Sequence, residues 1–261
     1  MRQFFKDRDG SFATVDCSDW MDFKNKIQQV ALYPNGKENG KFLFRGQGCS
    51  SWGLTSSFDR KFGDLPPAEL DSIYLRRMKL FEKNFSIYGN MAKDSRGIQL
   101  PTADEGSELT IEALAQHYGL STRLMDWSSS MYVASFFAFS GAQSSSTGMV
   151  SIWALQENAF ASFSTDHLEY LEDFYDQNVR NLWQMGSFSR NRTTVRNLED
   201  LFRSGSKHCS IDNGLPPMLF RFDVPVASSP EALSDLAMMR ISSMTIFPGI
   251  EGVVKWIEDG C

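Results

Sequence analysis

The stretch Leu114–Phe139, LAQHYGLSTRLMDWSSSMYVASFFAF, decides the fold because it joins two apolar helical patterns through a short polar interruption. The first pattern stops at Gly119, a residue suited to the left-handed conformation that closes many helices. The second begins after Ser128–Ser130, which offer N-caps, and its small Ala134 and Ala138 allow close packing. We therefore expect two buried helices with a polar segment between them.

Charged and aromatic side chains are concentrated in that polar segment. Arg123, Asp126 and Trp127 lie within five residues of one another, while both flanking patterns are apolar enough to enter a core. Polar groups held between buried elements must be paired, so this spacing predicts a network of buried or half-buried charge.

Composition limits the classes of protein to which the chain can be assigned. Its 261 residues are 42% hydrophobic, enough for a large core and too apolar for a disordered chain. The formal net charge of −6 argues against loose electrostatic binding to nucleic acid or to an anionic membrane, although a local basic face is compatible with it. Function must then reside in a specific site.

Cysteine and histidine spacing favours neither a metal site nor a disulfide framework. The four cysteines are far apart and form no CxxC pair, and the three histidines are scattered, so we expect no metal. The N-terminus MRQFFKDRDG lacks the apolar run of a signal peptide, and the run Tyr132–Phe139 is too short to span a bilayer. We expect a soluble, cytoplasmic protein with free thiols.

Periodicity predicts an α+β fold as a single domain over residues 1–261, with a mixed sheet of about five strands flanked by helices. The expected strands are 3–17, 41–48, 149–155, 218–224 and 242–247. The expected helices are 19–30, 66–85, 114–118, 131–139, 231–239 and 250–258. The last helix is expected to bury four side chains, Ile250, Val253, Val254 and Ile257.

Arg45 is the first candidate site residue. Alternation in KFLFRGQG places Leu43 and Arg45 on one face of a strand, with Phe42 on the other. Gly46 follows directly, so the backbone can turn sharply there and leave the guanidinium at a strand end. Two interpretations are open at this point: a site residue, or an arginine that pairs with a core carboxylate and joins two segments.

Two further polar features are weaker. His117, in the last turn of its helix, is interpreted more readily as a hydrogen-bonded structural histidine than as a ligand. Basic residues gather late in the chain, and we favour a solvated face that pairs with the preceding acids over a phosphate-attracting surface. They are Arg180, Arg190, Arg192, Arg196, Arg203 and Lys207.

Four ordered motifs give the chain a resemblance to the FRG domain family. The first is Phe44-Arg45-Gly46, followed by Gln47. The others are, in order, Gln116, His117, Tyr118, Gly119, Thr122, Arg123, Leu124, Asp126 and Trp127; then Arg180, Gln184, Gly186 and Phe188; then Ile246, Phe247, Pro248, Glu251 and Gly252. The resemblance covers about residues 18–258.

The chain departs from the family pattern at Ser121, where proline is frequent, at Met125, often leucine, and at Glu251, where the acid is more often an aspartate one residue earlier. The resemblance implies a bacterial or phage-associated protein. Some members are found near mobile elements or defence genes, and the family as such implies no particular reaction.

Three functional hypotheses follow. The first, by analogy alone, is an ADP-ribosyltransferase-like enzyme of bacterial defence or toxicity that uses NAD. Arg45 would hold the diphosphate, Ser121 and Thr122 would brace the nicotinamide pocket, and Glu251 would stabilise the ribosyl cation. Asp126 or Asp104 is an alternative acid. We therefore name Arg45, Thr122 and Glu251 as the catalytic candidates.

The second hypothesis is a non-catalytic module that binds a nucleotide or another small anion through Arg45, Gln47, His117, Ser121 and Arg123. A protein or nucleic acid is a further possible partner, as the acceptor of a transferred group. We expect no membrane partner, and the oligomeric state stays open.

The third hypothesis is a purely structural polar network, in which Asp126 pairs with an arginine and Trp127 and Gln184 support it. Where these residues form a site, we expect Arg45, Thr122 and Arg123 to face a cleft and Asp126 and Trp127 to brace it from behind.

Overall fold

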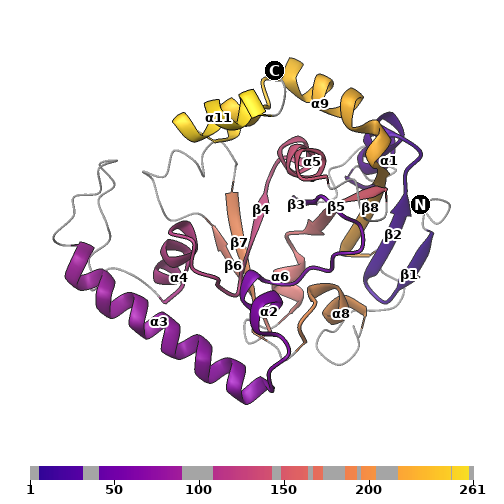
Figure 1. Cartoon of the computed structure of the whole chain (residues 1–261). Coiled ribbons are helices and arrows are strands. Elements are labelled where there is room, and N and C mark those ends of the chain that lie inside the picture. Colours follow the sequence, from indigo (N-terminus) through magenta and orange to yellow (C-terminus); the bar gives the residue numbers. More distant parts are fainter. Residues whose placement is uncertain are drawn as a thin grey trace.

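A computed structural model describes residues 6–31, 41–89, 108–142, 148–163, 167–172, 186–192, 195–203, 217–247 and 249–258. Its centre is one eight-stranded sheet in the order β1-β2-β8-β5-β3-β4-β7-β6 (Figure 1). The strands are β1 (Asp7–Asp9), β2 (Phe12–Asp16), β3 (Phe42–Gln47), β4 (Leu124–Ser128), β5 (Met149–Gln156), β6 (Leu168–Glu172), β7 (Gly186–Asn191) and β8 (Leu219–Pro225). β2 and β8 are parallel and the other neighbours are antiparallel, so the sheet is mixed, as expected.

Helices flank both faces of this sheet. They are α1 (Trp20–Ala31), α2 (Ser57–Phe62), α3 (Pro67–Gly89), α4 (Glu108–His117), α5 (Met131–Ser140), α6 (Ala159–Ser162), α8 (Leu198–Arg203), α9 (Ser229–Met238), α10 (Ser243–Ile246) and α11 (Ile250–Glu258), with a 3-10 turn η1 (Val226–Ser228). The mixed helix-and-sheet class is thus confirmed. Within the part of the chain described, none of these helices is both long and apolar enough to cross a membrane.

The expected number of about five strands is wrong. The N-terminal segment folds into the hairpin β1–β2, and β4, β6 and β7 lie in segments whose polar residues obscure a strand pattern. Conversely, the strand expected at 242–247 is the short helix α10, where the Ser242 amide donates to Thr245 Oγ1 at 3.0 Å. This contact is half of a capping box, a local bond that outweighs the weak strand propensity of SSMTIF.

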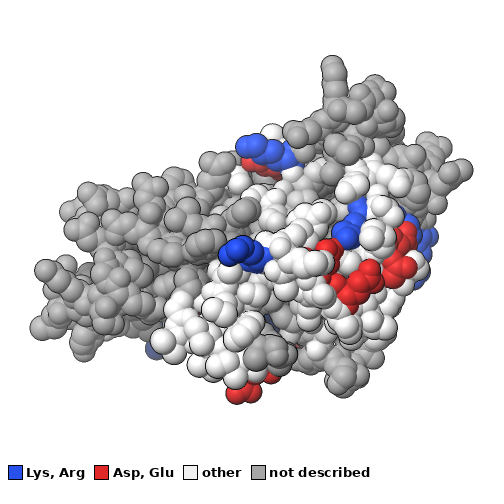
Figure 2. All heavy atoms as spheres, turned by 90° about the horizontal axis from the view of Figure 1, so that it is seen from above, with Lys and Arg blue, Asp and Glu red and all other residues white. Residues whose placement is uncertain are grey.

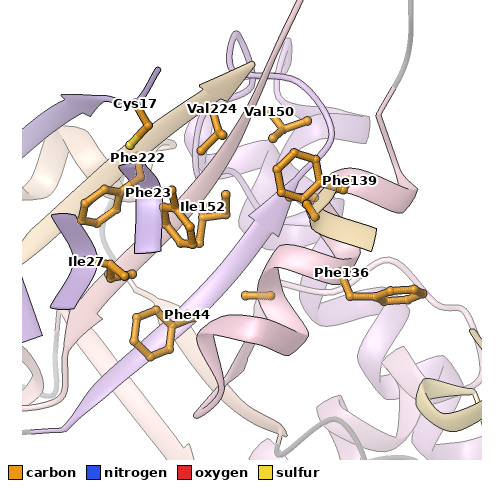
Figure 3. Packing of buried hydrophobic residues seen from close by; sticks show 14 of the residues in the cluster. Cys17, Phe23, Ile27, Phe44, Phe136, Phe139, Val150, Ile152, Phe222 and Val224 are labelled. Atoms are coloured by element: carbon orange, nitrogen blue, oxygen red, sulfur yellow. The ribbon is translucent and has the colours of Figure 1, made fainter. Parts of the chain in front are cut away.

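The larger core lies between one face of the sheet and the helices α1, α5 and α9, which are above the sheet in Figure 1. Phe44, Ile152 and Phe222 come from neighbouring strands, and Phe23 and Phe136 come from the helices that cover them (Figure 3). Burial of such aromatic and aliphatic side chains contributes about 1.5–3 kcal/mol each, so this face carries much of the fold's stability.

The opposite face has a second core and a polar row. Leu43, Trp153 and Leu219 pack there against α6 and α8. Arg45 lies on the same face, because side chains along β3 alternate and Phe44 points into the larger core. The alternation predicted from the sequence therefore places Arg45 correctly.

The stretch that joins the two helices is largely strand. α4 ends at His117, and Gly119 has a φ of +85°, as expected for a residue that closes a helix. The chain then enters β4 instead of a loop, and Ser130 caps α5 by accepting from the Val133 amide. Strand pairing with β7 satisfies the backbone of this polar segment, which explains how it runs between two buried helices.

α11 does not bury the four residues expected. Ile250, Val253, Val254 and Ile257 are exposed, and the helix instead packs against α10 through Gly252. The amphipathic pattern therefore predicted the helix correctly, but the apolar side chains lie on the surface and not in the core.

Candidate functional site

The candidate site forms where β3 and β4 separate. β3 pairs with β5 along its whole length, whereas its register with β4 consists of one pair, Phe44 with Ser128. Arg45 spans the widening gap: its Nη1 donates to the Asp126 carbonyl oxygen at 2.6 Å and lies 3.6 Å from Asp126 Oδ2. The Arg45 side chain is 19% exposed, and its Nε has no hydrogen-bond acceptor among the described residues.

Gly46 has a packing role different from the one expected. It stays within β3 and does not start a sharp turn. A Cβ at this position would lie 1.9 Å from the Ala134 carbonyl oxygen and 2.6 Å from the Ala138 nitrogen. The glycine thus lets α5 lie directly on β3, and the small Ala134 and Ala138 meet it, as predicted from their size.

Gln116 connects Asp126 to Thr122. Its Nε2 donates to Asp126 Oδ1 at 2.7 Å, and its Oε1 accepts from the Thr122 hydroxyl. Thr122 is fully buried, while the Asp126 side chain is 64% exposed. The expected arrangement is thereby reversed: Asp126 faces outward and Thr122 braces it, because the Thr122 oxygen is occupied by Gln116 and by the Leu124 amide.

α2 brings a second guanidinium to this place. Thr122 O accepts from the Phe58 amide at 3.0 Å, and the Ser57 hydroxyl accepts from the Thr122 amide at 3.1 Å, so these contacts hold the start of α2 against the segment before β4. Arg60, one turn along α2, is exposed and donates to Thr55 O. Partial burial of its guanidinium, and after it the positive charge of Arg45, lower the pKa of Arg60, while Asp126 opposes this effect.

We call Arg45, Arg60, Gln116, Thr122 and Asp126 the Arg45 cluster. The positive charge of Arg45 contributes to the lowered pKa of Arg60, so the two guanidinium groups act on each other. It holds one carboxylate, and that carboxylate is largely in solvent. The arrangement is therefore electropositive at its exposed edge, despite the acidic net charge of the chain.

Arg123 belongs to a different set of contacts. Its Nη2 is 2.6 Å from Asp71 Oδ1 on α3, and its guanidinium lies over the rings of Phe58 and Tyr74, 5.4 and 4.8 Å from their centroids. It is thus directed toward α2 and α3 and does not join the Arg45 cluster, contrary to the expectation that it faces the same site.

A buried ion-pair network supports the segment from the other side. Glu112 Oε2 lies 2.8 Å from Arg190 Nη1, and Arg190 also contacts Glu169 at 2.9 Å. Glu112 accepts as well from the Tyr74 hydroxyl and from the Arg123 amide. Burial raises the pKa of Glu112, and the positive charge of Arg190 together with the hydrogen bonds that Glu112 accepts offsets part of that effect.

This network corrects part of the interpretation of the basic stretch. Arg190 and Arg192 do pair with the preceding acid Glu169. Arg190, however, is 5% exposed, so it is part of the interior and not of a solvated face.

The remaining predicted site residues make separate contacts of their own. Gln47 is buried, accepting from the Trp153 indole and donating to Gly53 O, which fixes the loop after β3. Trp127 donates to Ser189 Oγ at 2.7 Å inside the second core. Ser121 is half-buried directly before Thr122, and His117 is half-buried with its ring edge-on to Tyr118.

Glu251 is exposed on the first turn of α11, on the side of the molecule where α10 and α11 pack together. Among the described residues no hydrogen bond or ion pair joins it to Arg45 or Thr122. Gln184, Arg180 and Asp104 lie outside the described residues.

Arg60 and Glu112 were not predicted. Arg60 reaches the site because α2 docks on Thr122. This contact joins residues that are far apart in the chain, so no local sequence pattern could predict it. Glu112 lies on the same helix as Gln116, one turn before it, so its position in the motif-bearing helix was the available signal.

The protein is thus an α+β fold in which β3 carries the Phe-Arg-Gly motif, and Arg45 of this motif joins β3 to β4. Residues 40–147 match the model of the FRG domain, which supports the resemblance to the FRG domain family. The match includes the first two motifs and ends before the third and fourth. No curated protein and no solved structure matches the chain.

Proposed function

We propose that the Arg45 cluster binds a small anionic ligand that carries a phosphate or diphosphate group, of the nucleotide class. The observation that carries this proposal is the pair Arg45 and Arg60, whose like charges act on each other beside one exposed carboxylate. Like charges that act on each other disfavour the folded state unless anions compensate them, and Asp126, the carboxylate of the cluster, is largely in solvent. Perturbed charged groups of this kind are concentrated at functional sites.

The hydrogen-bonding capacity of the pair fits this ligand. Each guanidinium has five N–H donors arranged as a fork that suits phosphate oxygens. Arg45 uses Nη1 for Asp126, and Arg60 uses Nη1 for Thr55 O. Within the described residues this leaves donors on Arg60 for a ligand, and Gln116 holds Asp126 in place from the other side.

A more specific proposal is that the ligand is NAD and that the protein transfers or releases its ADP-ribosyl group. Such chemistry needs a carboxylate near the developing oxocarbenium charge. Asp126 is the exposed acid beside Arg45, whereas Glu251 lies on α11. Asp126 is thus the better-supported candidate for the acid, with Thr122 and Gln116 as positioning residues.

Binding is tested by calorimetric titration of inorganic pyrophosphate, ADP-ribose and NAD into the protein. Arg60→Gln should weaken binding of all three at least about tenfold, equivalent to about 1.4 kcal/mol. Arg76→Gln, which makes the same change at an exposed position of α3, should leave affinity unchanged. If the wild-type protein binds none of the three compounds, the proposal is contradicted and the Arg45 cluster is a purely structural network.

Turnover is tested separately by following NAD and nicotinamide chromatographically. Asp126→Asn keeps an acceptor for Gln116 while removing the charge, so loss of NAD consumption with retained binding and an unchanged melting temperature would assign Asp126 as the acid. If the wild-type protein binds NAD and never consumes it, the protein is a binding module. A variant that simply unfolds would instead favour a structural role for Asp126.

A further inference from the structure

Trp52 lies in the loop between β3 and α2 and differs from the tryptophans of the two cores. Trp20, Trp127 and Trp153 are buried, and each donates its indole N–H to a neighbouring side chain. Trp52 is 45% exposed, and among the described residues its ring has no stacking partner and its indole no hydrogen-bond acceptor. Such a side chain offers a flat apolar face and an indole donor to a ligand.

The backbone beside Trp52 is fixed over the face of the sheet that carries Arg45. Gln47 Nε2 donates to the oxygen of Gly53, the residue after Trp52, at 3.1 Å. Gln47 and Arg45 are two residues apart on β3, so their side chains leave the same face. A Cβ on Gly53 would lie 2.5 Å from Glu199 Oε1, so the loop is packed against the start of α8 (Figure 1). A tryptophan on a fixed backbone loses little conformational freedom when a ligand stacks on it.

The same loop ends at the second arginine of the Arg45 cluster. Thr55 O accepts from Arg60 Nη1 at 2.5 Å, and the Thr55 amide donates to Gly53 O at 2.9 Å, which closes a tight turn. Consecutive Cα atoms are about 3.8 Å apart, so the Cα atom of Trp52 lies within about 11 Å of that of Thr55. In a nucleoside diphosphate one sugar separates the base from the phosphates. Trp52 and Arg60 are therefore close enough for one nucleotide to contact both.

We propose that Trp52 stacks on the base of a nucleoside diphosphate whose phosphates lie at Arg45 and Arg60. This inference rests on the proposed anion site and adds the part of the ligand that makes it a nucleotide. The arginine pair binds the charge, and the indole face binds an aromatic base. Because stacking tolerates any base, Trp52 selects for the presence of a base and not for its identity. Trp52 is thus the residue that distinguishes a nucleotide from a diphosphate without a base.

Trp256 supplies a matched control. It is 39% exposed, a fraction similar to that of Trp52, but it lies on α11, at the opposite end of the molecule from α2 (Figure 1). Figure 2 shows the face that carries α11, where the visible Lys and Arg side chains are scattered among uncharged residues. Trp256 therefore has the exposure of Trp52 without the arginine pair.

The test is calorimetric titration with ADP and with ribose 5-diphosphate, which carries the same diphosphate ester and lacks the base. The wild-type protein should bind ADP at least about tenfold more tightly than ribose 5-diphosphate. Trp52→Ala should remove this preference by weakening the binding of ADP alone, and Trp52→Phe should retain part of it because the smaller ring still stacks. Trp256→Ala should change neither affinity. The melting temperature of each variant checks that the fold is retained.

Tryptophan fluorescence gives a second readout. ADP should quench the emission of the wild-type protein with the dissociation constant that calorimetry gives, ribose 5-diphosphate should not, and Trp52→Phe should abolish the quenching. Equal affinities of the wild-type protein for the two compounds, or an equal loss of both affinities in Trp52→Ala, overturn the inference and leave the anion site standing. If neither compound binds, and pyrophosphate does not bind either, the proposed function fails and this inference fails with it.

Discussion

At the scale of single residues, the Phe-Arg-Gly motif has two separable roles. Arg45 bridges the gap between β3 and β4, while Gly46 allows α5 to lie on β3. The face of the sheet on which Arg45 lies could be predicted from the sequence, because the alternation of side chains along a strand is a local pattern. The role of Gly46 could not be derived, since the close approach involves a helix almost ninety residues later.

Gly46→Ala should therefore destabilise the protein by about 3 kcal/mol or more, because the added methyl group meets backbone atoms of α5 that cannot move aside. Gly119→Ala serves as the comparison. That site is open but has a φ of +85°, so its cost should be limited to about 1–2 kcal/mol. Urea unfolding measures both, and equal costs at the two positions would contradict the proposed packing role.

Glu112 should make stability depend on pH. Burial raises the pKa of Glu112 above its ordinary value of 4.5, so the folded state retains a proton that the unfolded state releases. At pH values below the pKa of Glu112 in the unfolded chain, protonated Glu112 contributes its full stabilisation to the folded state. This stabilisation is lost as the pH rises through the higher pKa that Glu112 has in the folded protein. Glu112→Gln removes this dependence.

The destabilisation caused by Glu112→Gln should therefore shrink as the pH increases across that window. Urea unfolding of the wild-type protein and the variant at a series of pH values measures the difference between their free energies of unfolding. The contributions of the other carboxyl groups are the same in both proteins and therefore cancel in this difference. A difference that grows with pH would show instead that ionised Glu112 is the favoured form and that Arg190 dominates its environment.

At the scale of elements, long apolar helices were predictable and polar strands were not. α1 and α5 begin and end close to the residues that periodicity and capping indicate, whereas α4 ends where expected but begins six residues earlier. β4 and β7 carry Asp126 and Arg190, whose side-chain partners lie on other elements, so their local pattern does not alternate clearly. α11 was recognised as amphipathic, but amphipathicity does not show whether the apolar side lies in the core or on the surface.

Arg123 is expected to hold α3 to the rest of the molecule. Its guanidinium lies over Tyr74 and is 2.6 Å from Asp71, both on α3. Arg123→Ala should cost about 1–3 kcal/mol through lost stacking and pairing, and Arg123→Lys should recover only part of it because lysine lacks the planar group. Hydrogen exchange should become faster in residues 67–80 and not in α1; uniform acceleration would argue against a local clamp.

At the scale of the whole molecule, both cores share one sheet. Phe222 and Ile152 face the larger core, while Trp153 and Leu219 on the same strands face the second. Neither core can lose its strands without exposing the other. We therefore expect residues of both cores to unfold together, as a single domain would.

Unfolding in urea should give coincident transitions by far-ultraviolet circular dichroism and by tryptophan fluorescence, which reports on Trp20 in the larger core and Trp153 in the second. Two separated transitions would divide the chain into independent domains.

The location of the Arg45 cluster was partly predictable at this scale. Arg45 and Asp126 were identified from motifs, whereas the position of Arg60 depends on how α2 docks against Thr122.

The central claim is that the Arg45 cluster binds a phosphate-bearing anion. The most direct measurement is a crystal structure of the protein with pyrophosphate. We predict density for the diphosphate with oxygens about 2.7–3.2 Å from guanidinium nitrogens of Arg60, beside Arg45 and Asp126. Crystals grown at saturating pyrophosphate with no density there, and with Arg45 still bound to Asp126 as it is now, would contradict the claim.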